Sequence, residues 1–352
     1  MSQLLATRTS KRLRRYTTVG SIASVIAVSV LLVSCSSTGS SSTSTSAPIN
    51  DSAKGVSIVV VAGTSSDPFM SSVKHGVDAA ALAVKAAGGS VTYLTLQNYQ
   101  NLGPDTAKLA QTALNLHPTA IVVPDFVPSA EDPTLRSIVK AGITLVLYNS
   151  GSEAEAQKLG ALTYIASDYE ASGVAAGKEL LAAGAKDVVF VDTIPGNPSA
   201  DAMNNGYKSA VTSGGGKFRE LTLPATSFQN TTAVTQAIKS ELINSPSIDA
   251  IATWATPDDD SAAAAISQNN ATGKVKLVGF GLSTNALSRI KAGTQLAATD
   301  QQPYAQGYYA VSAAFQYAAY GIALPTKLLT GPLVVDSKNV VQAIHGTSLG
   351  VR

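Results

Sequence analysis

Short apolar runs alternate with amphipathic stretches along most of this chain. The run 56–62 is almost entirely β-branched or small and apolar, which predicts a strand buried on both faces. After a polar break, Asp67 and Pro68 predict a helix start, with Asp67 as N-cap and Pro68 at the first helical position. Apolar residues then recur at helical spacing over 73–84. This succession of strand, loop and helix is typical of a parallel sheet.

The same unit recurs to the end of the chain. Further strands are expected at 91–96, 120–124, 143–149, 163–167, 188–192, 218–223, 250–255, 275–281, 296–301 and 329–335, most of them followed by a helical pattern. Repeated strand–helix units imply parallel sheets with right-handed crossovers. The chain has 352 residues, which is more than one compact core usually holds. The pattern therefore predicts an α/β fold with two doubly wound parallel-sheet lobes.

The N-terminal segment has a different pattern. Basic residues gather over 8–15, a short apolar run covers 19–33, and the only cysteine of the chain follows at Cys35. This arrangement predicts an export signal over 1–34 that is removed from the mature protein. The stretch LVSC at 32–35 resembles a bacterial lipobox, which implies that Cys35 is lipidated and anchors the protein to the outer face of the cell membrane. The alternatives are an ordinary secretory signal or a single anchor helix.

Residues 35–54 are rich in serine and threonine and hold no apolar cluster, so we expect a flexible tether. The whole chain has a formal charge of +2, but the first 34 residues carry five basic and no acidic side chains. The mature protein is therefore net negative, and no basic patch indicates nucleic-acid binding.

Catalytic and metal-binding motifs are not evident. His75, His117 and His345 are far apart in sequence, and no pair of them has the spacing of metal ligands. The chain has neither a G-x-S-x-G elbow nor a phosphate-binding P-loop. We therefore expect no enzyme activity, no metal and no cofactor.

Three longer stretches carry a family resemblance: DPFMSSVKHGVDAAA at 67–81, YIASDYEASGVAAGKEL at 164–180, and KLVGFG with ALSRIKAGTQLAATDQQPYAQGYYAV at 276–281 and 286–311. Together they resemble the type I periplasmic binding proteins of the ribose-binding family, which are the sugar receptors of ABC importers. The resemblance implies a monomer whose two lobes are joined by a three-segment hinge and close around a ligand. It also implies that a membrane permease recognises the closed form.

Carried onto this sequence, the resemblance places the N-terminal lobe at 55–149 and 303–333, and the C-terminal lobe at 150–302 and 334–352. The three chain crossings are then expected near Asn149–Ser150, Gln301–Gln302 and Val335–Asp336.

The first candidate ligand-binding residues lie just after predicted strands. Asp67 matches a polar loop position of the family, Phe69 matches its stacking aromatic, and Gln301 matches its cleft glutamine. Met70 departs from the family, in which a second aromatic is common, but it can still pack against a ligand. Alternatively, Asp67 only caps its helix, Phe69 belongs to the core, and Gln301 only supports the hinge.

The remaining candidates show more departures. Tyr148 and Asn149 stand where relatives often have Asp-Arg, and Asp201 stands where an arginine is common. From the acidic run at 258–260 we expect Asp258 in the cleft, although the run could instead form an exposed helix cap. Trp254 either stacks on the ligand or packs beneath the loop.

These departures favour a neutral, polyhydroxylated ligand, either a sugar or a sugar alcohol, over an anion. The function predicted is a receptor that delivers this ligand to an ABC permease. The alternative is an extracytoplasmic sensor of the same fold that reports its ligand to a membrane signalling protein. A glycoside hydrolase or a cytosolic repressor of the related lac-repressor type is disfavoured, the latter by the export signal.

Overall fold

The computed structural model describes residues 53–352. The predicted signal peptide at 1–34, the predicted lipidation site Cys35 and nearly all of the predicted tether at 35–54 lie outside the described residues. Within 53–352, no helix has both the length and the apolar character needed to cross a bilayer.

The strands form two separate six-stranded sheets. The first sheet has the order β11-β5-β4-β3-β1-β2, and all of its neighbouring strands pair in parallel. Its strands are β1 (Ser57–Ala62), β2 (Ser90–Thr95), β3 (Ala120–Val123), β4 (Thr144–Tyr148), β5 (Thr163–Ala166) and β11 (Lys327–Leu329). The central strands β3 and β4 are almost completely buried, as their unbroken apolar runs predict.

The second sheet repeats this arrangement with the order β12-β10-β9-β8-β6-β7. Its strands are β6 (Asp187–Asp192), β7 (Lys217–Thr222), β8 (Ala250–Thr253), β9 (Lys276–Phe280), β10 (Ala297–Asp300) and β12 (Leu333–Val335). Only the edge strand β12 runs antiparallel to its neighbour, β10. The two sheets confirm the predicted fold class of two doubly wound α/β lobes.

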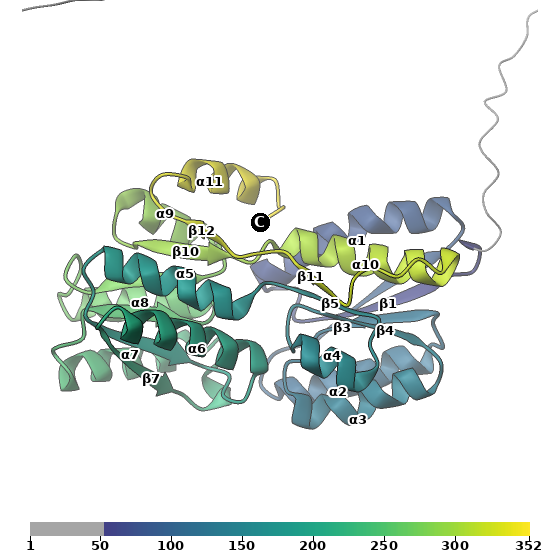
Figure 1. Cartoon of the computed structure of the whole chain (residues 1–352), viewed down its shortest axis with the longest axis horizontal. Helices are drawn as coiled ribbons and strands as arrows, with labels where there is room; N and C mark the ends of the chain where they lie inside the picture. Colours follow the sequence, from purple (N-terminus) through teal and green to yellow (C-terminus); the bar gives the residue numbers. More distant parts are fainter. Residues whose placement is uncertain (1–52) are drawn as a thin grey trace, which may run out of the picture. The chain divides into compact units, whose positions relative to one another are not determined.

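Helices cover both faces of the first sheet. The helices α1 (Pro68–Ala86) and α10 (Pro303–Tyr320) lie side by side over one face, and α2 (Leu102–Asn115) and α3 (Pro128–Lys140) lie over the other (Figure 1). The short helix α4 (Glu153–Leu159) packs against α3 and β5. Thus α10, which comes more than two hundred residues after α1, completes the N-terminal lobe.

The second lobe is covered by three helix pairs. The helices α5 (Tyr169–Ala182) and α6 (Pro198–Ser213) pack together, as do α7 (Thr231–Asn244) with α8 (Thr256–Gln268), and α9 (Thr284–Ala292) with α11 (Val340–Ser348). A single 3₁₀ turn, η2 (Ala225–Ser227), precedes α7.

The closest helix pair in each lobe meets through facing glycines. A Cβ atom on Gly76 of α1 would lie 2.0 Å from the carbonyl oxygen of Tyr304, in α10. In the second lobe, a Cβ atom on Gly173 of α5 would lie 2.1 Å from the carbonyl oxygen of Met203, in α6. Because no side chain fits at these distances, the two backbones touch directly, and both crossings require glycine.

The strand pairing places two of the three lobe crossings differently from the sequence-based expectation. β5 pairs with β4 in the first sheet, so the first crossing follows β5, near Ser167–Asp168, and not Asn149–Ser150. The predicted strand 329–335 is in fact two short strands: β11 belongs to the first sheet and β12 to the second. The third crossing therefore lies between these two strands, at 330–332, and not at Val335–Asp336 as expected. The second crossing lies at Gln301–Gln302, between β10 and α10, where it was expected.

Candidate functional site

A cavity of about 610 Å³, partly open to solvent, lies between the two lobes. Its walls come mainly from residues at or just after the carboxyl ends of strands in both sheets, where open α/β sheets bind their ligands. The wall is rich in aromatic residues, which are Phe69, Tyr99, Phe126, Tyr169, Phe228, Trp254 and Phe280. Its polar side chains are Asp67, Asn149, Ser150, Gln229, Thr256 and Gln301.

Asp67 is the only carboxylate among the residues that line this cavity, and no lysine, arginine or histidine lines it. Its Oδ1 atom accepts a hydrogen bond from the backbone N–H of Phe69 at 2.9 Å, so Asp67 is the N-cap of α1, as predicted. Its Oδ2 atom accepts from the Tyr99 hydroxyl at 2.8 Å. Burial raises the pKa of Asp67, and these hydrogen bonds oppose that shift. Asp67 therefore both caps α1 and lines the cavity.

A cluster of three aromatic side chains forms part of the second-lobe wall. Trp254 stacks on Phe280 with ring centroids 5.4 Å apart and an interplanar angle of 20°. Tyr169 contacts both rings, with centroid distances of 5.8 Å to Trp254 and 5.7 Å to Phe280. Trp254 thus packs against its neighbours and also lines the cavity, so both readings of this residue apply.

Phe69 and Met70, at the start of α1, line the cavity from the first lobe. Met70 is buried, and its sulfur lies 3.9 Å from the Tyr148 hydroxyl. The two residues add apolar surface to the first-lobe side of the cavity wall.

A small network of amide side chains lies where the chain crosses between lobes. The Asn149 side chain donates from Nδ2 to Oε1 of Gln301 at 3.4 Å and to Oε1 of Gln306 at 3.3 Å. Gln306 in turn donates to the backbone carbonyl of Gln301 at 3.0 Å. Asn149 has a positive φ of 60°, a conformation that asparagine tolerates better than most residues. The network holds two predicted site residues, Asn149 and Gln301, in the cavity wall.

Three predicted site residues do not line the cavity. Tyr148 is fully buried, and its hydroxyl donates to the backbone carbonyl of Val61 at 3.1 Å, because residue 148 faces the opposite side of the strand from Asn149. Asp201 is exposed on the first turn of α6. Asp258 lies behind the cavity wall, fully buried, with its Oδ2 accepting from the Thr193 hydroxyl at 2.9 Å.

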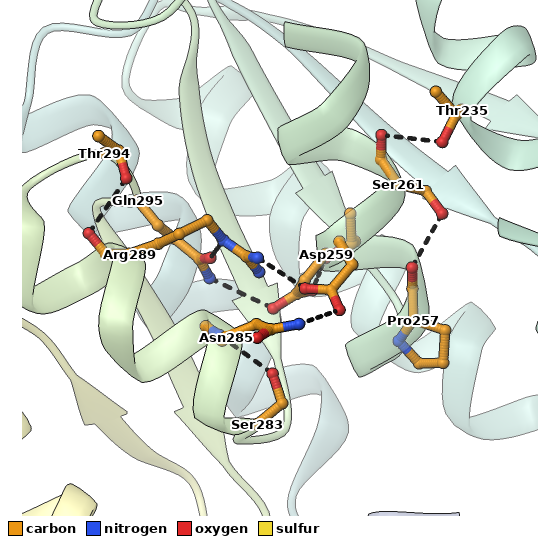
Figure 2. Close-up of polar contacts among 12 residues, drawn as sticks. Thr235, Pro257, Asp259, Ser261, Ser283, Asn285, Arg289, Thr294 and Gln295 are labelled. Carbon is orange, nitrogen blue, oxygen red and sulfur yellow. Dashed lines mark hydrogen bonds and ion pairs between the residues drawn. The ribbon is translucent and has the colours of Figure 1, made fainter. Parts of the chain in front are cut away.

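The acidic run 258–260 supports the second lobe internally. Asp259 accepts a hydrogen bond from Gln295 at 3.2 Å (Figure 2) and another from Thr253. Asp260 forms a 2.6 Å ion pair with Arg289. Asp258 and Asp259 are in the first turn of α8, where carboxylates favour the helix dipole. The run is therefore mostly buried, contrary to the alternative of an exposed cap.

Sequence reasoning missed several cavity residues. Tyr99 follows β2, and Phe228 and Gln229 lie in the loop between η2 and α7. The Tyr99 and Phe228 rings meet edge-on, with centroids 5.2 Å apart, and Gln229 approaches Asp67 at 3.5 Å. The position of Tyr99 after a strand was a usable signal, whereas the loop holding Phe228 shows no pattern that distinguishes it from other surface loops.

The two lobes also contact each other on another side of the cavity. The Asn197 side chain, which caps α6, donates from Nδ2 to the carbonyl of Phe126 and to the hydroxyl of Ser150, both at 2.8 Å. The Ser199 hydroxyl donates to the carbonyl of Gly151 at 3.0 Å. Because these contacts join the second lobe to the first, the structure is that of a closed two-lobed molecule.

The fold and the cavity together define a two-lobed solute-binding protein. A family model described as a periplasmic binding protein domain matches residues 58–322, and the chain therefore belongs to this family. The resemblance found in the sequence is confirmed. No curated protein matches the chain.

Solved structures show the same fold over almost their entire length. A carbohydrate transporter from Acidothermus cellulolyticus 11B, in complex with myo-inositol, is 27% identical, with a TM-score of 0.74, and the match covers 85% of this chain and 100% of that one. The glucose-galactose binding protein GanP from Geobacillus stearothermophilus is 19% identical, with a TM-score of 0.73 and coverage of 81% and 99%. The periplasmic ribose ABC transporter from Conexibacter woesei DSM 14684 is 18% identical, with a TM-score of 0.70 and coverage of 85% and 98%.

Proposed function

We propose that this protein is a lipid-anchored receptor that captures a neutral sugar or sugar alcohol between its lobes and delivers it to the permease of an ABC importer. The observation that carries this proposal is the interlobe cavity, whose aromatic faces are combined with amide and hydroxyl groups and a single carboxylate.

The chemistry of the wall suits a polyol. The C–H faces of a sugar ring or cyclitol pack on aromatic rings, and Phe69 and Trp254 offer such faces from opposite lobes. The hydroxyls need convergent donors and acceptors, which Asp67, Asn149 and Gln301 supply. With no cationic side chain in the wall, an anionic ligand would lack a counter-charge. The myo-inositol bound to the Acidothermus neighbour supports a cyclic polyol.

Lobe closure supplies the signal for delivery. A ligand that touches both lobes stabilises the closed state in proportion to its preference for that state over the open one. The contacts of Asn197 and of Tyr99 with the opposite lobe are made in this closed state, which the permease would recognise.

A thermal-shift screen against pentoses, hexoses, sugar alcohols and inositols tests ligand capture. A ligand at 100 times its dissociation constant should stabilise the protein by roughly 2.7 kcal/mol, which raises the melting temperature on the order of 5 °C. The Phe69→Ala variant should lose most of this shift because it removes one aromatic face. The control variant Tyr309→Ala, on the exposed side of α10, should keep it. A cooperative melt with no response to any polyol would contradict the proposal.

Membrane anchoring and delivery are tested in cells. Replacing Cys35 with serine removes the only thiol of the chain and should move the protein from the membrane fraction to the soluble fraction. Deleting the protein should abolish uptake of the labelled ligand. Continued membrane association of the serine variant would argue against a lipid anchor, and normal uptake without the protein would favour the sensor alternative.

A further inference from the structure

Asp125 is a buried carboxylate without a hydrogen-bond donor. It follows β3 in the first lobe, its exposed fraction is 0%, and no N–H or O–H group donates to either of its side-chain oxygens, whose hydrogen-bonding neighbour is the carboxyl group of Glu131. Buried polar groups are nearly always paired, and an isolated buried charge is strongly unfavourable. Either a proton or a cation must therefore compensate the charge of this side chain.

Two other carboxylates approach Asp125 from neighbouring helices. Asp132 is in α3 and Glu155 is in α4, and one oxygen from each of the three side chains lies within 4.8 Å of the other two. The Oδ1 atom of Asp132 is also buried without a hydrogen-bond partner. The three side chains thus come together between the end of a strand and two helices.

The nearby cations reach only the outer part of this cluster. Lys158 lies 3.3 Å from Oδ2 of Asp132 and 3.1 Å from Oε2 of Glu155, and Arg136 lies 3.1 Å from the same oxygen of Asp132. Neither side chain forms an ion pair with Asp125 among the described residues. The Lys158 side chain is 56% exposed, so it can move into solvent at little cost.

A fourth carboxylate, Glu131, offers another way to compensate the buried charge of Asp125. It accepts from the backbone N–H groups of Phe126 and Val127 at 2.8 and 3.1 Å and lies beside Asp125. Burial, followed by the charge of Asp132, raises the pKa of Asp125 to about 7. A proton shared between Asp125 and Glu131 could therefore neutralise the pair, but it would leave Oδ1 of Asp132 without a partner.

We propose that Asp125, Asp132 and Glu155 bind a divalent cation that prefers oxygen ligands, specifically Ca²⁺. Calcium takes carboxylate oxygens at roughly 2.3–2.6 Å in irregular geometry, so one ion can contact three oxygens at this spacing. The ligand set contains no nitrogen or sulfur, which disfavours zinc and copper. On binding, the ion takes the place of the Lys158 ammonium group and also reaches Asp125, which the lysine does not.

The site adjoins the interlobe cavity. Phe126 follows Asp125 directly, its side chain lines the cavity, and its carbonyl accepts the hydrogen bond from Asn197 of the second lobe. An ion at Asp125 would therefore fix the segment on which the lobes close. The proposal concerns a cation site and holds whether or not the cavity binds a sugar.

The test is a thermal melt of the metal-free full-length protein in increasing CaCl₂, with NaCl at matched ionic strength. We expect Ca²⁺ to raise the melting temperature by a few degrees at concentrations well above its dissociation constant. Asp125→Asn and Glu155→Gln should each weaken this response on the order of 10–100-fold in concentration. Asp78→Asn, which alters an exposed carboxylate of α1, is the matched control and should leave the response unchanged.

A Lys158→Met variant separates the two explanations. If Ca²⁺ competes with the lysine, this variant should respond at lower Ca²⁺ than the wild type does. No Ca²⁺ response in either the wild type or Lys158→Met would overturn the proposal and leave the shared proton as the explanation. A response that persists unchanged in Glu155→Gln would also overturn it, because the ion would then bind elsewhere.

Discussion

The side chain of Asp67 has two structural roles. As the N-cap of α1 it accepts from a backbone N–H group, and as part of the cavity wall it accepts from the hydroxyl of Tyr99. A carboxylate has about four acceptor positions, so it can still take hydrogen bonds from a ligand. Because burial raises its pKa, its charged form is not fully compensated by the hydrogen bonds from the protein. Ligand hydroxyls that donate to it would supply the missing stabilisation.

Asp258 should make the stability of the protein depend on pH. Burial raises its pKa to about 8, far above the ordinary value of an aspartic acid, so the folded state keeps a proton that the unfolded state loses. The resulting contribution to stability is present below about pH 4 and is lost as the pH rises toward 8. The slope is at most about 1.4 kcal/mol per pH unit.

The Asp258→Asn variant cannot ionise at this position. Its free energy of unfolding, measured by urea denaturation between pH 5 and 8, should therefore fall less steeply with pH than that of the wild type. The matched variant Asp105→Asn, in the first turn of α2, should keep the wild-type slope. Parallel curves for Asp258→Asn and the wild type would show that this carboxyl group is not the titrating one.

Among individual residues, position relative to the strands explains which of the predicted site residues line the cavity. Asp67, Phe69, Met70, Asn149, Trp254 and Gln301 line the cavity because they end or follow strands, a position readable from sequence. Tyr148 is one residue from Asn149 but on the opposite face, and a family pattern alone does not fix that alternation. Asp125 gives no sequence signal, because its carboxylate neighbours come from separate helices.

At the scale of elements, the two glycine-mediated helix crossings are the most demanding packing features. The α5–α6 crossing has Gly173 against Met203 and Gly206 against Glu170, with hypothetical Cβ atoms 2.1 Å from a carbonyl oxygen in both cases. An added methyl group would force the helices apart.

We expect Gly173→Ala to lower the free energy of unfolding by about 1–3 kcal/mol, the usual cost of overpacking, even though alanine is the better helix former. The control Ser209→Ala, on the exposed side of α6, should change stability by less than about 0.5 kcal/mol. Urea or thermal denaturation measures both. A Gly173→Ala protein as stable as the wild type would mean that the two helices can separate at no cost.

The type of each element was easier to predict from the sequence than the strand with which it pairs. The apolar runs correctly predicted the strands of both sheets, because period and length are local properties of the sequence. The stretch 329–335 looked like one strand, but its two halves pair with different sheets, which depends on the position of β5 and β10. The short helices α4 and α11 were not predicted, because each spans few turns and shows only a weak pattern.

At the scale of the whole molecule, Asn197 should contribute to closure. It caps α6 and also bridges to Phe126 and Ser150 of the first lobe. Asn230 caps α7 through the backbone N–H of Ala233 but makes no recorded bond to the first lobe, which makes it the matched control.

Replacing either asparagine with alanine should cost about 1 kcal/mol of stability through the lost cap. Only Asn197→Ala should also weaken ligand affinity, by roughly tenfold, because each hydrogen bond lost from the closed state is worth about 1 kcal/mol. Calorimetric titration with the ligand found by screening gives the affinities. Equal affinity in the two variants would exclude Asn197 from the closing contacts.

Because the chain passes from the first sheet to the second and back again, it determines the order in which the two lobes can be completed during synthesis. The first sheet lacks its edge strand β11, and the α1 face lacks its partner α10, until residue 329 has been made. By then β6 to β10 of the second sheet are complete. The lobe that begins first therefore cannot be completed until most of the second lobe has been made, and its early segments stay exposed to chaperones and proteases while most of the second lobe is synthesised. No single cut in the chain could release either lobe as an autonomous folding unit.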